Sequence, residues 1–131
     1  MSTLAGTQKP GLRAHQEATR ASVPELVSGL REIIGVRLVA YLGNVKSTRA
    51  VAEWADGARK PGETDVDRLR LAYQVAILLR EQNEAVTVQS WFKGMNPALG
   101  DVSPARVLRE GAPDVVGPDV MGAAKAFAFI G

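Results

Sequence analysis

Residues 90–108 read SWFKGMNPALGDVSPARVL and carry the most informative pattern in the chain. A tryptophan and a phenylalanine lie near the end of one predicted helix, an Asn-Pro pair forms a turn, and a Gly-Asp pair separates that turn from the next segment. Ser103 is typical of a helix N-cap, and Pro104 takes a first-turn position where proline costs no hydrogen bond. The stretch therefore predicts a helix, a turn and a new helix that opens at residue 103.

Upstream of this stretch, apolar side chains recur at helical spacing. Ser22 is predicted to cap a helix that ends near Gly35. A long helix is expected from Thr64, its predicted cap, and is apolar over most of its circumference, which favours the centre of a bundle over a dimer seam. No segment alternates with period two for long enough to predict a sheet. The fold class is therefore all-α, a small helical bundle.

Two short helices are predicted between residues 35 and 61, joined by a turn at Gly43-Asn44. Two helices with such a turn form a helix-turn-helix, whose second helix enters the major groove of DNA. Ser47 is expected to cap the second helix, and Gly57 to end it. The side chains expected to be buried are Leu38, Tyr41, Leu42 and Val45 on the first helix and Ala50, Val51, Trp54 and Ala55 on the second.

With those side chains buried, the start of the second helix projects outward. Arginine can contact a guanine edge or a phosphate, and serine and threonine are common phosphate partners. The candidate DNA-binding residues are Lys46, Ser47, Thr48, Arg49, Arg59 and Lys60. An ordinary solvated helix face is the alternative, and Glu53 and Asp56 are unfavourable beside DNA.

Composition and charge narrow the functions to consider. Residues 1–60 hold nine Lys and Arg against five Asp and Glu, whereas residues 61–131 hold seven against nine. This asymmetry suggests two faces with different partners, and ordinary scatter of charge is the alternative. Cysteine is absent, which excludes disulfides and thiolate chemistry. Residues 1–21 are mostly polar, lack the apolar core of a secretory signal and are expected to form a flexible tail. No apolar run reaches the ~20 residues that span a bilayer.

An enzyme is not predicted from these residues. The single histidine, His15, lies in the expected tail, where nothing would orient it as a base. No phosphate-binding glycine loop or metal-spaced cluster is present in the sequence, and no cofactor is expected. Asp65 and Asp67 are better explained as partners of a helix dipole.

Two motifs carry a resemblance to a known family. The order W…NPALG…SP…L resembles the C-terminal toxin-binding domain of the Xre/MbcA/ParS antitoxins. The pattern V-x-S-x-x-x-V-x-x-W-x-x-G-x-x-x-P over residues 45–61 is similar to the recognition-helix segment of Xre-type regulators. Together they cover residues 35–131 and imply a helix-turn-helix region at residues 22–62 and a helical toxin-binding domain at residues 63–131.

The resemblance implies an antitoxin of a type II toxin–antitoxin pair. Such a protein neutralises a RES-domain toxin that consumes NAD by binding over its active site, and it represses its own operon through DNA binding. The expected partners are the cognate toxin, operator DNA and a second copy in a homodimer, and the expected location is the cytoplasm. A stand-alone helix-turn-helix regulator without a toxin is the alternative, and a pure protein-interaction module comes third.

The end of the chain departs from the family, whose members commonly finish in a polar, acidic helix. Here the last twelve residues are mainly apolar with one cation, and such a segment can enter the cleft of a neighbouring protein. The candidate toxin-binding residues are Lys125, Phe127, Phe129, Ile130 and Gly131. The alternative is that both phenylalanines fold back onto the protein's own core. Trp54 and Trp91 are assigned to packing.

Overall fold

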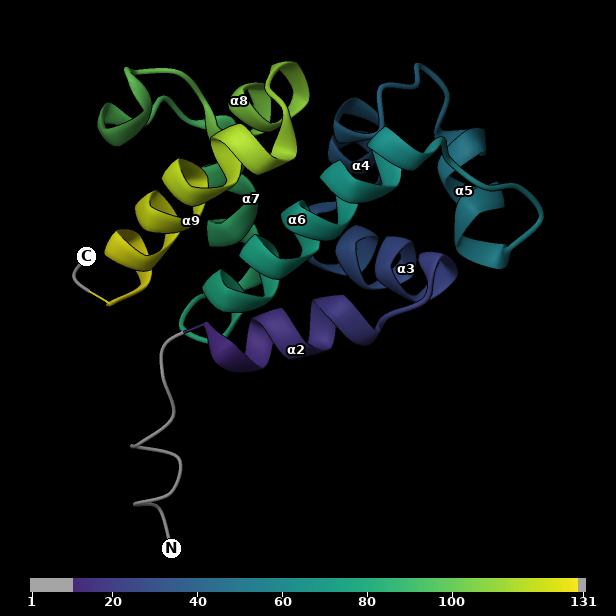
Figure 1. The fold of residues 1–131 in the computed structure, drawn as a ribbon, viewed down its shortest axis with the longest axis horizontal. Helices are drawn as coiled ribbons and strands as arrows, with labels where there is room; N and C mark the ends of the chain where they lie inside the picture. Colours follow the sequence, from purple (N-terminus) through teal and green to yellow (C-terminus); the bar gives the residue numbers. More distant parts are fainter. Residues whose placement is uncertain (1–10, 130–131) are drawn as a thin grey trace, which may run out of the picture.

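The protein is seen in a computed structural model that describes residues 11–129 (Figure 1). Within this range the secondary structure is helical, and the prediction of an all-α bundle is confirmed. The elements are α2 (Leu12–Arg20), α3 (Val23–Ile34), α4 (Val36–Leu42), α5 (Thr48–Asp56), α6 (Glu63–Arg80), α7 (Ala85–Lys93), the 3₁₀ turn η1 (Pro97–Leu99), α8 (Pro104–Glu110) and α9 (Pro113–Phe129). Judged by length and hydropathy, none of the helices described over residues 11–129 could span a membrane.

Helix α6 forms the centre of the bundle, as its apolar circumference predicts. It packs against α2, α3 and α9, and Figure 1 shows it running through the middle of the molecule. Leu69, Ala72, Val75 and Leu78 are fully buried along it. One continuous cluster of buried side chains includes residues from every α-helix from α2 to α9, so the two expected regions share a core.

Several helix ends follow directly from local sequence. Ser22 and Glu25 form a reciprocal capping box, in which the Ser22 backbone N–H donates to Glu25 Oε1 at 2.8 Å. This backbone bond lowers the pKa of Glu25 from its usual value. The hydroxyls of Ser47 and Ser103 accept backbone bonds at the starts of α5 and α8. These caps lie where the sequence predicts them.

Two expectations about helix starts are wrong. Residues 11–21 are not a flexible tail, because α2 buries Ala14 and Ala18 against α6; residues 1–10 lie outside the described range. Thr64 does not cap the long helix, since α6 begins at Glu63 with Gly62 as its N-cap. His15 consequently lies on a helix, where its side chain is exposed.

Arg70 holds α2 in place from the central helix. Its Nη1 donates to the backbone oxygens of Ala18 at 2.7 Å and Ala21 at 2.6 Å, so it satisfies carbonyls that the end of α2 leaves without helical partners. These bonds span about fifty residues of sequence, and the sequence patterns gave no sign of them.

Replacing this arginine is expected to release α2. Arg70→Met keeps an unbranched apolar stem but removes both charged hydrogen bonds, which should cost about 2 kcal/mol of local stability. Hydrogen exchange of the residue 12–20 amides should rise about 30-fold, while α6 amides stay protected. Arg80→Met, which removes an exposed bond to Asn83 at the end of the same helix, is the control. Equal exchange in both variants would show that α2 is held by its apolar contacts alone.

Candidate functional site

The α4–α5 unit consists of two short helices that pack against each other and are joined by a tight turn. Asn44 adopts the left-handed conformation, with φ at 60°, and allows the chain to reverse between the two helices. Ala50, Val51 and Trp54 of α5 are buried as expected. On α4 the buried stripe is displaced: Val39, Ala40 and Leu42 are buried, whereas Leu38 and Tyr41 are only partly covered. Val45, also expected on this helix, lies in the turn after it and is partly covered.

The displacement follows from the short length of α4 and its several neighbours. This seven-residue helix packs against α3, α5 and α8, and it also meets α6, so its buried face is not set by one contact. Two side chains from distant segments hold its C-terminal end. Arg68, itself buried, donates to the Leu42 backbone oxygen at 3.1 Å, and Arg109 donates to Asn44 Oδ1 at 3.0 Å.

Gly43 is needed because Trp54 packs directly on the turn. A Cβ at residue 43 would lie 2.6 Å from Cζ3 of Trp54, closer than packed atoms come. Gly43→Ala is therefore expected to lower the free energy of unfolding by about 1–3 kcal/mol through displacement of the indole. Urea denaturation followed by tryptophan fluorescence would measure this.

Gly122→Ala is the matched control for that substitution. Residue 122 lies on an exposed position of α9, and a Cβ there would meet no atom within 4 Å. Alanine should be neutral or stabilise the helix by up to about 1 kcal/mol. Similar midpoints for the Gly43→Ala and wild-type proteins would contradict tight packing of Trp54 on the turn.

The candidate DNA-binding side chains lie at both ends of α5, four at its start and two just beyond its end. The Ser47 hydroxyl accepts from the backbone N–H of Arg49 at 3.0 Å and fixes the first turn of the helix. Each candidate residue at the helix start or just beyond its end is exposed, as the DNA-binding prediction requires. This set is Lys46, Ser47, Thr48, Arg49, Arg59 and Lys60.

Glu53 modifies the charge of this face. Its carboxylate lies 3.6 Å from Arg49 Nε and 3.6 Å from Arg59 Nη1, so it joins the two arginines. Exposed ion pairs of this length contribute little to stability. DNA binding by this face would require both arginines to exchange a carboxylate for a phosphate or base. The Lys46 ammonium, by contrast, has no ion-pair partner among residues 11–129.

The end of α9, which carries Lys125, Phe127 and Phe129, lies at the opposite end of the molecule from α5 (Figure 1). Lys125 is exposed on α9, and residues Phe127 and Phe129 are 38% and 47% exposed. The alternative that both phenylalanines join the core is therefore wrong, since neither belongs to the buried cluster. Ile130 and Gly131 lie outside the described residues.

Trp91 on α7 and the Asn-Pro turn after it have structural roles in the region between α5 and the end of α9. Trp91 and Phe92 are buried and meet edge to face, with ring centroids 5.3 Å apart, and Trp54 is buried too, which confirms the packing role of both tryptophans. Asn96 Oδ1 accepts from the Ala98 backbone N–H at 3.0 Å and caps η1. The turn thus positions α8 against α4 and α9.

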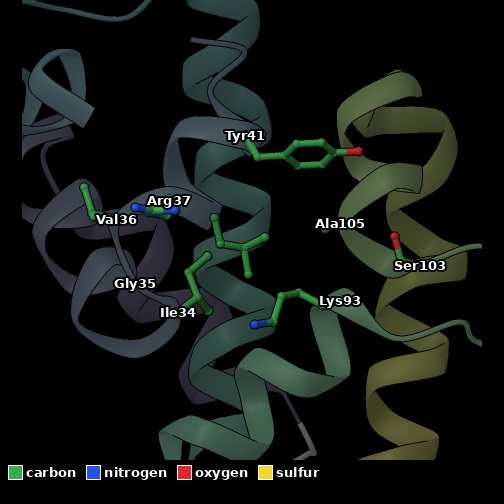
Figure 2. Close-up of a pocket in the computed structure, with 9 residues that line it drawn as sticks. Ile34, Gly35, Val36, Arg37, Tyr41, Lys93, Ser103 and Ala105 are labelled. Carbon is green, nitrogen blue, oxygen red and sulfur yellow. The ribbon is translucent and has the colours of Figure 1, made fainter. Parts of the chain in front are cut away.

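A cavity of about 590 Å³ opens where α3, α4, α7 and α8 meet (Figure 2). Its wall is largely apolar, and Ala105 of α8 contributes to it. Tyr41 extends from α4 toward α8, while Lys93 points toward the α3–α4 junction. Arg37 and Lys93 are exposed cations of this wall, and no acidic side chain from residues 11–129 lines it. The cavity therefore suits a ligand that has both an apolar part and a negatively charged group. The sequence patterns did not reveal it.

No family model and no curated protein matches the sequence. Among solved structures, a chain of the M. tuberculosis MbcT-MbcA toxin-antitoxin complex is similar, with a TM-score of 0.67 and 26% sequence identity. The match covers 82% of this chain and 95% of that chain. The fold is that of an MbcA-type antitoxin.

The resemblance expected from the sequence motifs is thereby confirmed. The MbcA-type fold supports an antitoxin role and a toxin as partner for this chain. It also favours a non-catalytic regulator over an enzyme. Among the described residues no group of His, Asp or Glu side chains is arranged to hold a metal ion.

Proposed function

We propose that this chain is the antitoxin of a type II toxin–antitoxin pair. It neutralises a RES-type toxin that consumes NAD by covering the active site, and it represses its own operon through the α4–α5 unit. The observation that carries the proposal is the likeness to a chain of a toxin–antitoxin complex over 95% of that chain's length. A protein that represses its operon acts where the DNA lies, so we place it in the cytoplasm.

The positions of the two candidate surfaces support two partners at once. Cations are exposed at both ends of α5, and Phe127 and Phe129 are exposed at the end of α9. Helix α5 and the end of α9 lie on opposite sides of the bundle (Figure 1). A toxin on α9 therefore leaves the α5 surface open to DNA. Recognition of two operator half-sites calls for two copies of the chain related by a two-fold axis, and we infer a homodimer on DNA.

Co-expression tests the toxin half of this proposal. The protein encoded beside this chain is produced alone and together with it, and growth, intracellular NAD and co-purification are measured. We expect the neighbour alone to stop growth and deplete NAD, and the pair to grow normally and purify as a complex. A benign neighbour that forms no complex would contradict the antitoxin function.

A stand-alone regulator remains the second candidate, because the α4–α5 unit retains its capped second helix and its exposed cations. A sequence-selective footprint on the upstream DNA, in the absence of any toxic neighbour, would favour it. Failure of the purified chain to bind any duplex, even at low salt, would leave protein binding as its role.

A further inference from the structure

A second cavity, of about 650 Å³, lies between α4, the α4–α5 turn, the start of α5 and α8. Three cationic side chains from separate segments line it: Arg37 from α4, Lys46 from the turn and Arg109 from α8. The hydroxyl residues Ser47 and Thr48 line it as well. Within the described chain no Asp or Glu contributes to this wall, so its charge is uncompensated.

Arg109 is fixed in place before any ligand arrives. Its guanidinium carbon lies 4.4 Å from the centroid of the Tyr41 ring, and its Nη2 donates to Asn44 Oδ1 at 3.0 Å. Neither partner is charged, so the arginine keeps its full positive charge. Arg106, on the same helix, differs because its Nε lies 3.0 Å from the Glu110 carboxylate.

The chemistry that converges on this cavity is that of a phosphate site. Arginine and lysine form charge-assisted hydrogen bonds with phosphate oxygens, and hydroxyls at a helix start add neutral donors. The Ser47 oxygen already accepts from the Arg49 backbone N–H, so its own O–H is available to donate outward. The immobilised Arg109 loses little side-chain freedom on binding.

We propose that this cavity binds a backbone phosphate of duplex DNA, with Arg37 and Arg109 supplying charge beside Lys46. The proposal rests on the DNA-binding function proposed above and extends its surface to two arginines that the helix-turn-helix pattern did not contain. The duplex, rather than a free phosphate compound, is favoured because the cavity adjoins the exposed start of α5. A residue of α8 thereby takes part in DNA binding.

Salt-dependent DNA binding of Arg37→Gln and Arg109→Gln tests the proposal. The probes are a duplex from the region upstream of the gene and a random-sequence duplex of equal length. Each variant should weaken binding to both probes by the same factor and reduce the slope of log K against log salt by about 1. Arg106→Gln, which removes an ion-paired cation outside the cavity, should bind as wild type at equal thermal stability. Arg109→Lys should recover part of the loss, since it keeps the charge without the planar contact with Tyr41.

The outcomes separate this inference from the proposed function. If Arg49→Ala abolishes selectivity for the upstream duplex while the Arg37 and Arg109 variants match Arg106→Gln, the cavity assignment is wrong and DNA binding stands. If the wild-type protein binds no duplex even at low salt, both are wrong. If the two variants bind DNA normally but lose the toxin, the cavity holds an acidic segment of the partner and the phosphate assignment is overturned. Arg37 is exposed, so its variant reports binding even if Arg109→Gln fails to fold.

Discussion

Replacing Phe127 and Phe129 together by alanine is expected to abolish neutralisation of the toxin. Both rings are substantially exposed at the end of α9, so their loss leaves no cavity in the core. Aromatic anchors that enter a partner's pocket each contribute about 2 kcal/mol or more, so the double variant should weaken the complex at least several hundred-fold. Growth rescue and co-purification with the partner measure the effect.

Val115→Ala is the matched control, because it removes exposed apolar surface from the other end of the same helix. The Val115→Ala protein should neutralise the toxin as the wild type does. The double phenylalanine variant and the control should have equal thermal stability. If the double phenylalanine variant still rescues growth, the end of α9 is not the toxin-binding surface. Co-purification of the wild-type protein with the toxin would then still support the antitoxin function, but the toxin would bind another face of the protein.

Leu78→Ala is expected to destabilise the whole of the described chain. The side chain is fully buried in the last turn of α6, and truncation of such a leucine costs about 3–5 kcal/mol. Because one continuous core joins α2 to α9, residues 22–62 and 63–131 should unfold together rather than as two lobes. DNA binding and toxin neutralisation should therefore fail at the same temperature in this variant.

Two tryptophans allow the cooperativity to be measured directly. Trp54 reports on α5 and Trp91 on α7, so urea titrations of Trp54→Phe and Trp91→Phe proteins follow the two regions separately. Each should give one transition with the same slope, and Leu78→Ala should lower both midpoints. Val86→Ala, an exposed valine on α7, is the control. A low-urea transition seen only by Trp54 would show that the helix-turn-helix region unfolds independently.

Local sequence determined the helix ends and the turn chemistry of this protein. Ser47 and Ser103 cap their helices, and Gly57 ends α5 in the left-handed conformation, because each depends on atoms within a few residues. The apolar circumference of α6 predicted its central position, because a helix that is apolar over most of its circumference must be covered by neighbours on most sides. The order of the tryptophan, Asn-Pro and Ser-Pro motifs was sufficient to indicate the MbcA-type fold.

Where sequence reasoning failed, the missing partner lay far along the chain. Helix α2 is largely polar and buries only two alanines, so its apolar signal is weak, and its end is fixed by Arg70 about fifty residues away. The buried face of α4 was displaced because four neighbouring helices compete for a helix of seven residues. Exposure of the two C-terminal phenylalanines was left open for the same reason, since it depends on what α9 meets.

The sequence by itself determined that the chain is helical, that a tight turn joins two short helices in the region of α4 and α5, and that the start of α5 is cationic. Only the tertiary structure brought Arg109 of α8 within 3.0 Å of Asn44, 65 residues earlier, and so added a fixed guanidinium to the cationic wall beside α5. Periodicity and capping act over one or two turns of helix, whereas a cavity wall is assembled by packing between segments distant in sequence.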